Sequence, residues 1–187
     1  MNFFKYFILL IIFLITISCS KDKVKKSVIN EKNLDAQVFE AYQKGMDSLE
    51  AGDVLFAAKK FNEAEILFPQ SEWAPKSALM AAYSYYTQDY YKDAVAELER
   101  FIRIYPYYKD LDYAYYLMAI SHYEQIVDEK KDLQSIVNAK NNFSLIIKDY
   151  PNTEYALDAE FKLDLINDIL ASKEMYLGRY YLQKKKW

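Results

Sequence analysis

Residues able to do covalent or metal chemistry are few in this sequence of 187 residues. It contains one histidine, His122, one cysteine, Cys19, and 3 glycines. A serine or cysteine nucleophile usually needs a histidine base, a metal site needs several clustered ligands, and a phosphate-binding loop needs grouped glycines. His122 falls on the packing face of a predicted helix, where a core role is the simpler interpretation. We therefore expect no enzymatic activity, no metal and no cofactor.

Cys19 follows a segment that is typical of a secretory signal peptide. Lys5 precedes the apolar run "FILLIIFLITI", and Ser18 stands directly before the cysteine. The run is shorter than the roughly 20 residues of a permanent membrane-spanning helix. A small residue before the only cysteine resembles the bacterial lipoprotein signal, in which the cysteine is acylated; an ordinary signal peptide is the alternative. The sequence predicts a cleavable lipoprotein signal peptide over 1–18, lipidation of Cys19, and a flexible tether over 19–35.

The composition of the remaining chain favours helices. Hydrophobic residues make up 52% and charged residues 27%, which excludes disorder, and 3 glycines with 4 prolines are too few turn residues for a β-sandwich or barrel. The formal net charge of -3 argues against nucleic acid as a partner, because phosphate binding needs a concentrated basic face. We expect an all-α protein.

Three segments repeat one pattern, an apolar helical face followed by an aromatic residue and proline: "FNEAEILFPQS", "ELERFIRIYPYY" and "NNFSLIIKDYPNT". Spacings of four and three place small and large side chains on one face of each helix. The members are Ala57, Phe61 and Ala64; Ala94, Leu98 and Phe101; and Ala139, Phe143 and Ile146.

An earlier helix in each unit carries a small residue where two backbones must approach, at Gly45, Ala82 and Ala119. Helix, turn, helix and proline at a period of about 34 resemble the tetratricopeptide repeat. We predict a helical solenoid of about three and a half repeats over 36–187. Its parts are repeats at 38–71, 75–108 and 112–153, the third with a polar insertion near "VDEKKDLQ", and a long helix at 154–187 that begins a fourth, with Gly178 in the close-packing place.

Tyrosines recur on the first helix of each repeat at positions not needed for packing. Counting from the packing positions predicts an apolar peptide-binding groove lined by Tyr42, Lys76, Tyr83, Tyr86, Tyr113, Tyr116 and Tyr123. The alternative is a helical pair that packs with tyrosine and leaves the hydroxyls at the rim. Lys76 or Arg103 would lie near a peptide's terminal carboxylate. The carboxylates of Glu63, Glu65, Glu97 and Glu99 are expected to be exposed.

The order of these pieces resembles the BamD family of outer-membrane β-barrel assembly lipoproteins. The segments that carry the resemblance are "RFIRIYP" followed by "DYAYYLMA", and "KEMYLGRYYL". It implies a non-enzymatic scaffold, lipid-anchored at the periplasmic face of the outer membrane, that recognises unfolded outer-membrane proteins and binds the barrel-inserting, BamA-like subunit and other subunits of the complex. A different tetratricopeptide lipoprotein that organises the cell envelope is the alternative. The family has five repeats, so we expect this chain, which ends in "LGRYYLQKKKW", to be cut at the turn of the fourth.

Overall fold

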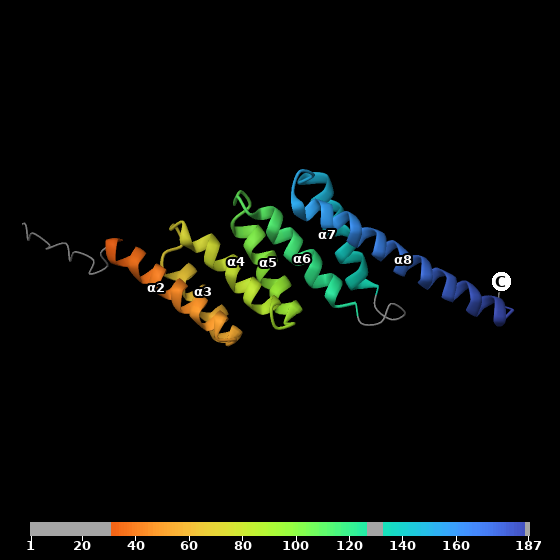
Figure 1. The fold of residues 1–187 in the computed structure, drawn as a ribbon, viewed down its shortest axis with the longest axis horizontal. Coiled ribbons are helices and arrows are strands. Elements are labelled where there is room, and N and C mark those ends of the chain that lie inside the picture. The colour runs from red at the N-terminus through yellow and green to blue at the C-terminus, as the bar shows by residue number, and fades with distance from the viewer. Residues whose placement is uncertain (1–30, 127–132, 186–187) are drawn as a thin grey trace, which may run out of the picture. The chain divides into compact units, whose positions relative to one another are not determined.

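Antiparallel helices follow one another along the described part of the chain (Figure 1). The computed structural model describes residues 31–126 and 133–185, which lie in one compact unit, Glu31–Trp187. Within those ranges there are helices but no strands, so the predicted all-α class is confirmed. The helices are α2 (Glu31–Glu50), α3 (Val54–Leu67), α4 (Trp73–Tyr86), α5 (Tyr91–Ile104), α6 (Leu111–Glu124), α7 (Gln134–Asp149) and α8 (Glu154–Gln183).

Each helix packs against the next one along the chain, and every second helix also touches its counterpart in the next repeat. Contacts join α2 to α4, α4 to α6, and α6 to α8. The first helices of the repeats therefore line one face of the unit, which we call the first-helix face. The second helices α3, α5 and α7 pack behind it, as a tetratricopeptide solenoid requires.

The structure bears on two of the predicted boundaries, the end of the tether and the insertion in the third repeat. Helix α2 begins at Glu31, so the last five residues of the predicted tether are helical, a correction that the polar sequence "EKNLD" did not reveal. The predicted insertion falls between Glu124, where α6 ends, and Gln134, where α7 begins. Residues 127–132 of that insertion, the signal peptide 1–18 and Cys19 lie outside the described residues.

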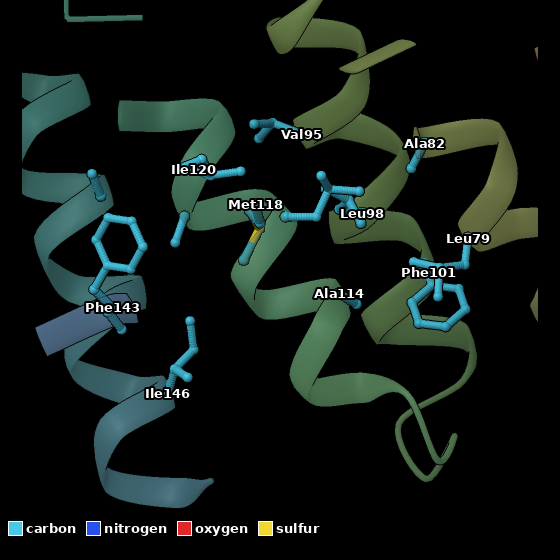
Figure 2. Packing of buried hydrophobic residues seen from close by; sticks show 14 of the residues in the cluster. Leu79, Ala82, Val95, Leu98, Phe101, Ala114, Met118, Ile120, Phe143 and Ile146 are labelled. Atoms are coloured by element: carbon cyan, nitrogen blue, oxygen red, sulfur yellow. The ribbon is translucent and has the colours of Figure 1, made fainter. Parts of the chain in front are cut away.

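The repeated apolar pattern forms the core. All nine side chains predicted from the spacing of four and three are fully buried, at 0% exposure. One cluster joins α2, α3 and α4, and a larger one runs from α4 to α8. Figure 2 shows part of the larger cluster, where Leu98 of α5 lies between Ala82 of α4 and Met118 of α6, and Phe101 of α5 lies beside Leu79 of α4. Repeats in this protein are thus held together by shared apolar layers, which is how a solenoid gains stability.

Close packing at the small residues is confirmed for the complete repeats but not for α8. A Cβ atom built on Gly45 would lie 2.7 Å from Cε1 of Phe61, and Ala82 and Ala119 are fully buried. A Cβ atom on Gly178 would meet nothing within 4 Å. Gly178 thus occupies the close-packing place of the pattern, but no described helix lies against it in this structure.

The turns between paired helices use residues that tolerate a left-handed backbone. Gly52 has φ 81°, and the side chain of Asp53 accepts a hydrogen bond from the N–H of Phe56 (3.2 Å), which caps α3. In the second repeat, where no glycine is present, Asp89 adopts φ 63°. Thr153 caps α8 by accepting a hydrogen bond from the N–H of Ala156.

Glu65 is buried, at 6% exposure, which corrects the prediction that it faces solvent. Its carboxylate accepts two hydrogen bonds from the guanidinium of Arg100 (2.8 and 2.6 Å) and one from the hydroxyl of Tyr105 (2.8 Å). Arg100 also donates to Glu97 (2.8 Å). Burial of this charge is tolerated because it is paired and hydrogen-bonded, and the pair ties α3 of one repeat to α5 of the next.

Helix α8 differs from the others in length and exposure. Its first half packs against α7 and α6 through Ala156, Ala159 and Ile166. From Glu174 to Gln183 every residue is exposed. The helix therefore continues for several exposed turns beyond the part whose side chains are buried against α6 and α7.

Candidate peptide-binding face

The seven predicted groove residues all lie on first helices, but their environments differ. Tyr42 is on α2; Lys76, Tyr83 and Tyr86 are on α4; and Tyr113, Tyr116 and Tyr123 are on α6. Contacts between successive first helices bring these helices into one continuous face. The face is uneven, because some tyrosines are covered by neighbouring side chains and others border an open hollow.

Tyr42 belongs mainly to the core of the first repeat. Its side chain is only 6% exposed, and its ring centroid lies 5.3 Å from that of Phe61 and 5.1 Å from that of Trp73. The ammonium of Lys76 lies 5.0 Å from the Tyr42 ring centroid and 4.9 Å from that of Trp73. These distances are within cation–π range. The two aromatic rings thus hold the Lys76 charge in place at the surface, while Tyr42 itself offers little area to a ligand.

Between α4 and α6 the face opens into a pocket of ≈ 370 Å³. Its lining residues come from α4, from the turn between α5 and α6, and from the start of α6 and α8. They are Lys76, Leu79, Met80, Tyr108, Lys109, Asp110, Asp112, Tyr113 and Tyr155. The apolar and aromatic members can receive one large side chain, and the charged members can orient a polar group beside it.

Of the predicted groove residues, Tyr113 and Lys76 line this pocket. Burial, with smaller effects of Tyr83 and Tyr155, raises the pKa of Tyr113 well above 10.0. Its ring centroid lies 5.5 Å from that of Tyr155. Tyr113 therefore stays neutral across the physiological pH range and presents a ring and a hydroxyl rather than a charge.

Two lysines line the pocket, one from a helix and one from a turn. Lys76 comes from a helix, as predicted, whereas Lys109 comes from the turn "YPYYKDLD". Arg103, which was expected beside a peptide carboxylate, is exposed on the second helix α5 and is absent from the lining of this pocket. Lys109 lines the pocket with Lys76 instead, together with the carboxylates of Asp110 and Asp112.

Tyr116 and Tyr123 are covered by α8. The hydroxyl of Tyr116 donates a hydrogen bond to Asp158 (2.8 Å), and its ring centroid lies 5.0 Å from that of Tyr155. Burial first, and then this hydrogen bond, raise the pKa of Tyr116. The ammonium of Lys162 lies 4.8 Å from the ring centroid of Tyr123. At these positions the tyrosines anchor α8 to the face, which is the packing alternative considered from the sequence.

Tyr83 and Tyr86 are half-buried on α4 and pack against the larger apolar cluster. Tyr86 lies 5.8 Å from Tyr91 between ring centroids, and burial raises its pKa. Both residues flank the pocket without lining it. They extend an aromatic surface along α4 that a bound chain could follow.

Other chemistry is sparse on the described residues. His122 is half-buried, and burial lowers its pKa below 6.5 against a smaller opposing effect of Glu99. Within residues 31–126 and 133–185, no group of three or more His, Cys, Asp or Glu side chains is arranged to hold a metal ion. The same ranges contain no helix that is both long and apolar enough to span a membrane.

Four of the lining residues that sequence reasoning missed come from outside the first helices, whereas Met80 lies on α4 and Asp112 on α6. Tyr108, Lys109 and Asp110 lie in a turn, and Tyr155 lies at the start of α8. Helical periodicity cannot place turn residues, so the only available signal was the concentration of tyrosine and charge in "YPYYKDLDY".

Comparison with known proteins gives a consistent result. The profile of the YfiO family, described as "Outer membrane lipoprotein", matches residues 34–187. The chain is 42% identical over 142 residues to "Outer membrane protein assembly factor BamD" of Caulobacter vibrioides, covering 76% of this chain and 47% of the relative. It is 37% identical over 177 residues to the protein of the same name from Rickettsia prowazekii, covering 95% and 68%. For the Neisseria gonorrhoeae protein, again of that name, the identity is 30% over 160 residues, covering 80% and 60%.

The matched region thus spans about half to two thirds of the length of these relatives.

Proposed function

This chain belongs to the YfiO family of outer membrane lipoproteins, and from that premise we propose that it acts in outer-membrane protein assembly by binding extended, aromatic-rich segments of unfolded outer-membrane proteins on its first-helix face. The relatives that share the matched region are named as assembly factors. The observation that carries the proposal is the pocket between α4 and α6, in which an apolar floor lies beside two lysines.

The pocket suits a peptide segment with one large apolar side chain. Leu79 and Met80 supply an aliphatic wall, and Tyr113 supplies a neutral aromatic one. A volume of ≈ 370 Å³ is near the lower end of small-ligand pockets and is ample for one aromatic side chain. Tyrosine contributes contact area at low entropic cost, because it has few rotatable bonds.

The charges at the rim of the pocket favour one orientation of the bound peptide. Lys76 and Lys109 can attract a terminal carboxylate, whereas Asp110 and Asp112 repel acidic side chains placed on their side. Because cation–π contacts with Tyr42 and Trp73 already position Lys76, its ammonium needs little reorganisation on binding. A segment that ends in an aromatic residue would place its ring in the pocket and its carboxylate between the lysines.

The wider role follows from the family and from the sequence. The chain associates with the outer membrane, as its family does. We place it at the periplasmic face, held there by acyl chains on Cys19. Its partners are then a BamA-like barrel-inserting subunit and the other subunits of the assembly complex, with no part for nucleic acid or for catalysis. This role is that of a scaffold that brings unfolded chains to the inserting subunit.

The peptide proposal can be tested by fluorescence anisotropy with a labelled decapeptide of alternating aromatic and aliphatic residues that ends in phenylalanine. The peptide is used with a free carboxylate and as the C-terminal amide. Lys109→Gln is expected to weaken binding of the carboxylate peptide by about two- to fivefold, the value of one exposed charge pair, and to leave the amide unchanged. Lys92→Gln, an exposed lysine on α5, is the matched control.

Two results would count against the proposal. One is equal affinity of the wild-type protein for the carboxylate and the amide, which would remove the role of the lysines. The other is unchanged affinity when Met80→Glu places a charge in the apolar floor, which would show that the peptide binds elsewhere.

A further inference from the structure

An exposed apolar patch lies behind the first-helix face, where α3 and α5 end. Ile66 is 75% exposed, Ile104 is 49% exposed, and both line a hollow of ≈ 440 Å³ together with Pro69 and Tyr105. Tyr107, two residues further along the same turn, is 97% exposed. We call Ile66, Pro69, Ile104 and Tyr107 the helix-end patch. Exposing side chains of this size to water has a cost, and Ile66, Pro69 and Ile104 share one hollow, which indicates an interaction surface.

The two carboxylates that line this hollow, Glu65 and Glu97, are already paired. Glu65 is buried and accepts hydrogen bonds from Arg100 and Tyr105, and Glu97 accepts one from Arg100. The exposed cation Arg103 precedes Ile104 directly on α5. A patch of aliphatic side chains and tyrosine with an arginine beside it has the composition of a surface that rests in a lipid headgroup layer.

The patch lies at the end of the unit from which the N-terminal segment leaves. Gln37 of α2 and Leu67 at the end of α3 line one hollow, so the end of α3 is beside the early part of α2. The turns after α3, α5 and α7 lie at this same end, as Figure 1 shows. The turns after α2 and α4 lie at the opposite end.

The short segment between Cys19 and α2 limits how far this end of the unit can lie from an acylated Cys19. Eleven residues, 20–30, separate Cys19 from Glu31. A fully extended segment of this length reaches roughly 40 Å, and a relaxed one much less. An acylated Cys19 therefore keeps the start of α2, and with it the helix-end patch, within reach of the membrane surface.

We propose that the helix-end patch docks on the phospholipid surface, with Tyr107 and Ile66 in the headgroup layer and Arg103 at its edge. This contact orients the unit so that the first-helix face stands upright from the membrane. The inference rests on the proposed lipid anchor at Cys19, which supplies the local concentration that a small patch needs.

The experiment uses the full acylated chain in vesicles of phosphatidylethanolamine and phosphatidylglycerol. Because acylation occupies the sulfur of Cys19, Tyr107→Cys provides a single thiol for an environment-sensitive fluorophore. We expect a blue shift and a loss of fluorescence when the vesicles contain brominated phospholipid. Ala51→Cys, exposed in the turn between α2 and α3 at the opposite end, is the matched control and should show neither.

A second variant separates the patch from the anchor. Ile66→Ser combined with Ile104→Ser removes apolar side chains that are already largely exposed, so the fold should be kept. This variant should still float with vesicles but should lose the quenching at position 107.

Flotation of the wild-type chain with equal, weak quenching at positions 107 and 51 would overturn the inference and leave the anchor intact. Absence of flotation would overturn the anchor and the inference together. Protection of the label only on addition of another assembly subunit, without lipid quenching, would assign the patch to a protein partner instead.

Discussion

Gly45 offers the sharpest test of how α2 and α3 pack. Replacing a helical glycine by alanine usually stabilises a protein, but at this position the added methyl group should destabilise it. In most helices, replacing glycine by alanine stabilises the helix by about 1 kcal/mol. At Gly45 the new Cβ atom would lie 2.7, 2.8 and 3.0 Å from three atoms of the Phe61 ring. Phe61 is fully buried and cannot swing away.

The magnitude follows from two opposing terms. Forcing one extra carbon into a well-packed core costs typically 1–3 kcal/mol, and this site lies toward the upper end since Phe61 also packs edge-on to Tyr42 at 5.3 Å. Subtracting the gain in helix propensity leaves a net loss of about 1–2 kcal/mol for Gly45→Ala. Gly178→Ala has the same chemistry without the contact, since nothing lies within 4 Å. It should be stabilising by up to about 1 kcal/mol.

Urea unfolding of both variants, followed by tryptophan fluorescence, measures the difference. Trp73 is well placed as a probe, with its ring centroid 5.1 Å from that of Tyr42, and Trp187→Phe removes the second tryptophan. The two variants should move the urea midpoint in opposite directions. In a double-mutant cycle, Gly45→Ala should cost less on a Phe61→Leu background than in the wild-type protein, because the ring that clashes is absent.

The reasoning would be refuted if Gly45→Ala raised the midpoint as much as Gly178→Ala. That result would mean that Phe61 moves at little cost and that the small residue is not required for close approach of α2 and α3.

Three further outcomes follow from the structure. Glu65→Gln should lower the free energy of unfolding, measured by urea titration, by about 2–3 kcal/mol. This is less than the roughly 3–5 kcal/mol for breaking a fully buried pair, because Arg100 is partly exposed and keeps its ion pair with Glu97. A loss of under about 0.5 kcal/mol would contradict this. Tyr116→Phe should flatten the decline of stability above pH 10. Burial first, and then the hydrogen bond to Asp158, raise the pKa of Tyr116 in the folded state, so the contribution of the neutral hydroxyl is complete below the unfolded value of 10.0 and is lost as the pH rises through the higher folded value. An identical pH profile for the variant would contradict this. In hydrogen exchange by mass spectrometry, residues 174–183 should exchange faster than 156–166, and equal protection would show that the exposed part of α8 is supported in solution.

Sequence periodicity was sufficient for the helices and their buried faces, because those depend on the residue spacing within one element. Ala57, Phe61 and Ala64 could be assigned to a core without knowing what lies against them. Gly178 has the same local pattern as Gly45, yet close packing needs a partner helix, which spacing within one helix cannot supply.

Pairing between repeats and the composition of the pocket could not be predicted in this way. Glu65 is buried because Arg100, 35 residues later, reaches it across two helices. Periodicity alone does not determine whether Tyr42 faces the core or the groove. Its side chain is enclosed because the rings of Trp73 and Phe61 lie against it. Lys109 lines the pocket because of the conformation of a turn, and helical periodicity does not predict turn conformations.

The central claim is that unfolded outer-membrane proteins bind at the pocket between α4 and α6. Photo-crosslinking in living cells from benzoylphenylalanine at position 80, which lines the pocket, tests it most directly. The account predicts adducts with outer-membrane proteins during their synthesis, reduced by Lys109→Gln. It predicts none from the same probe at position 55, which is exposed on α3. Adducts from position 55 and none from position 80 would contradict it.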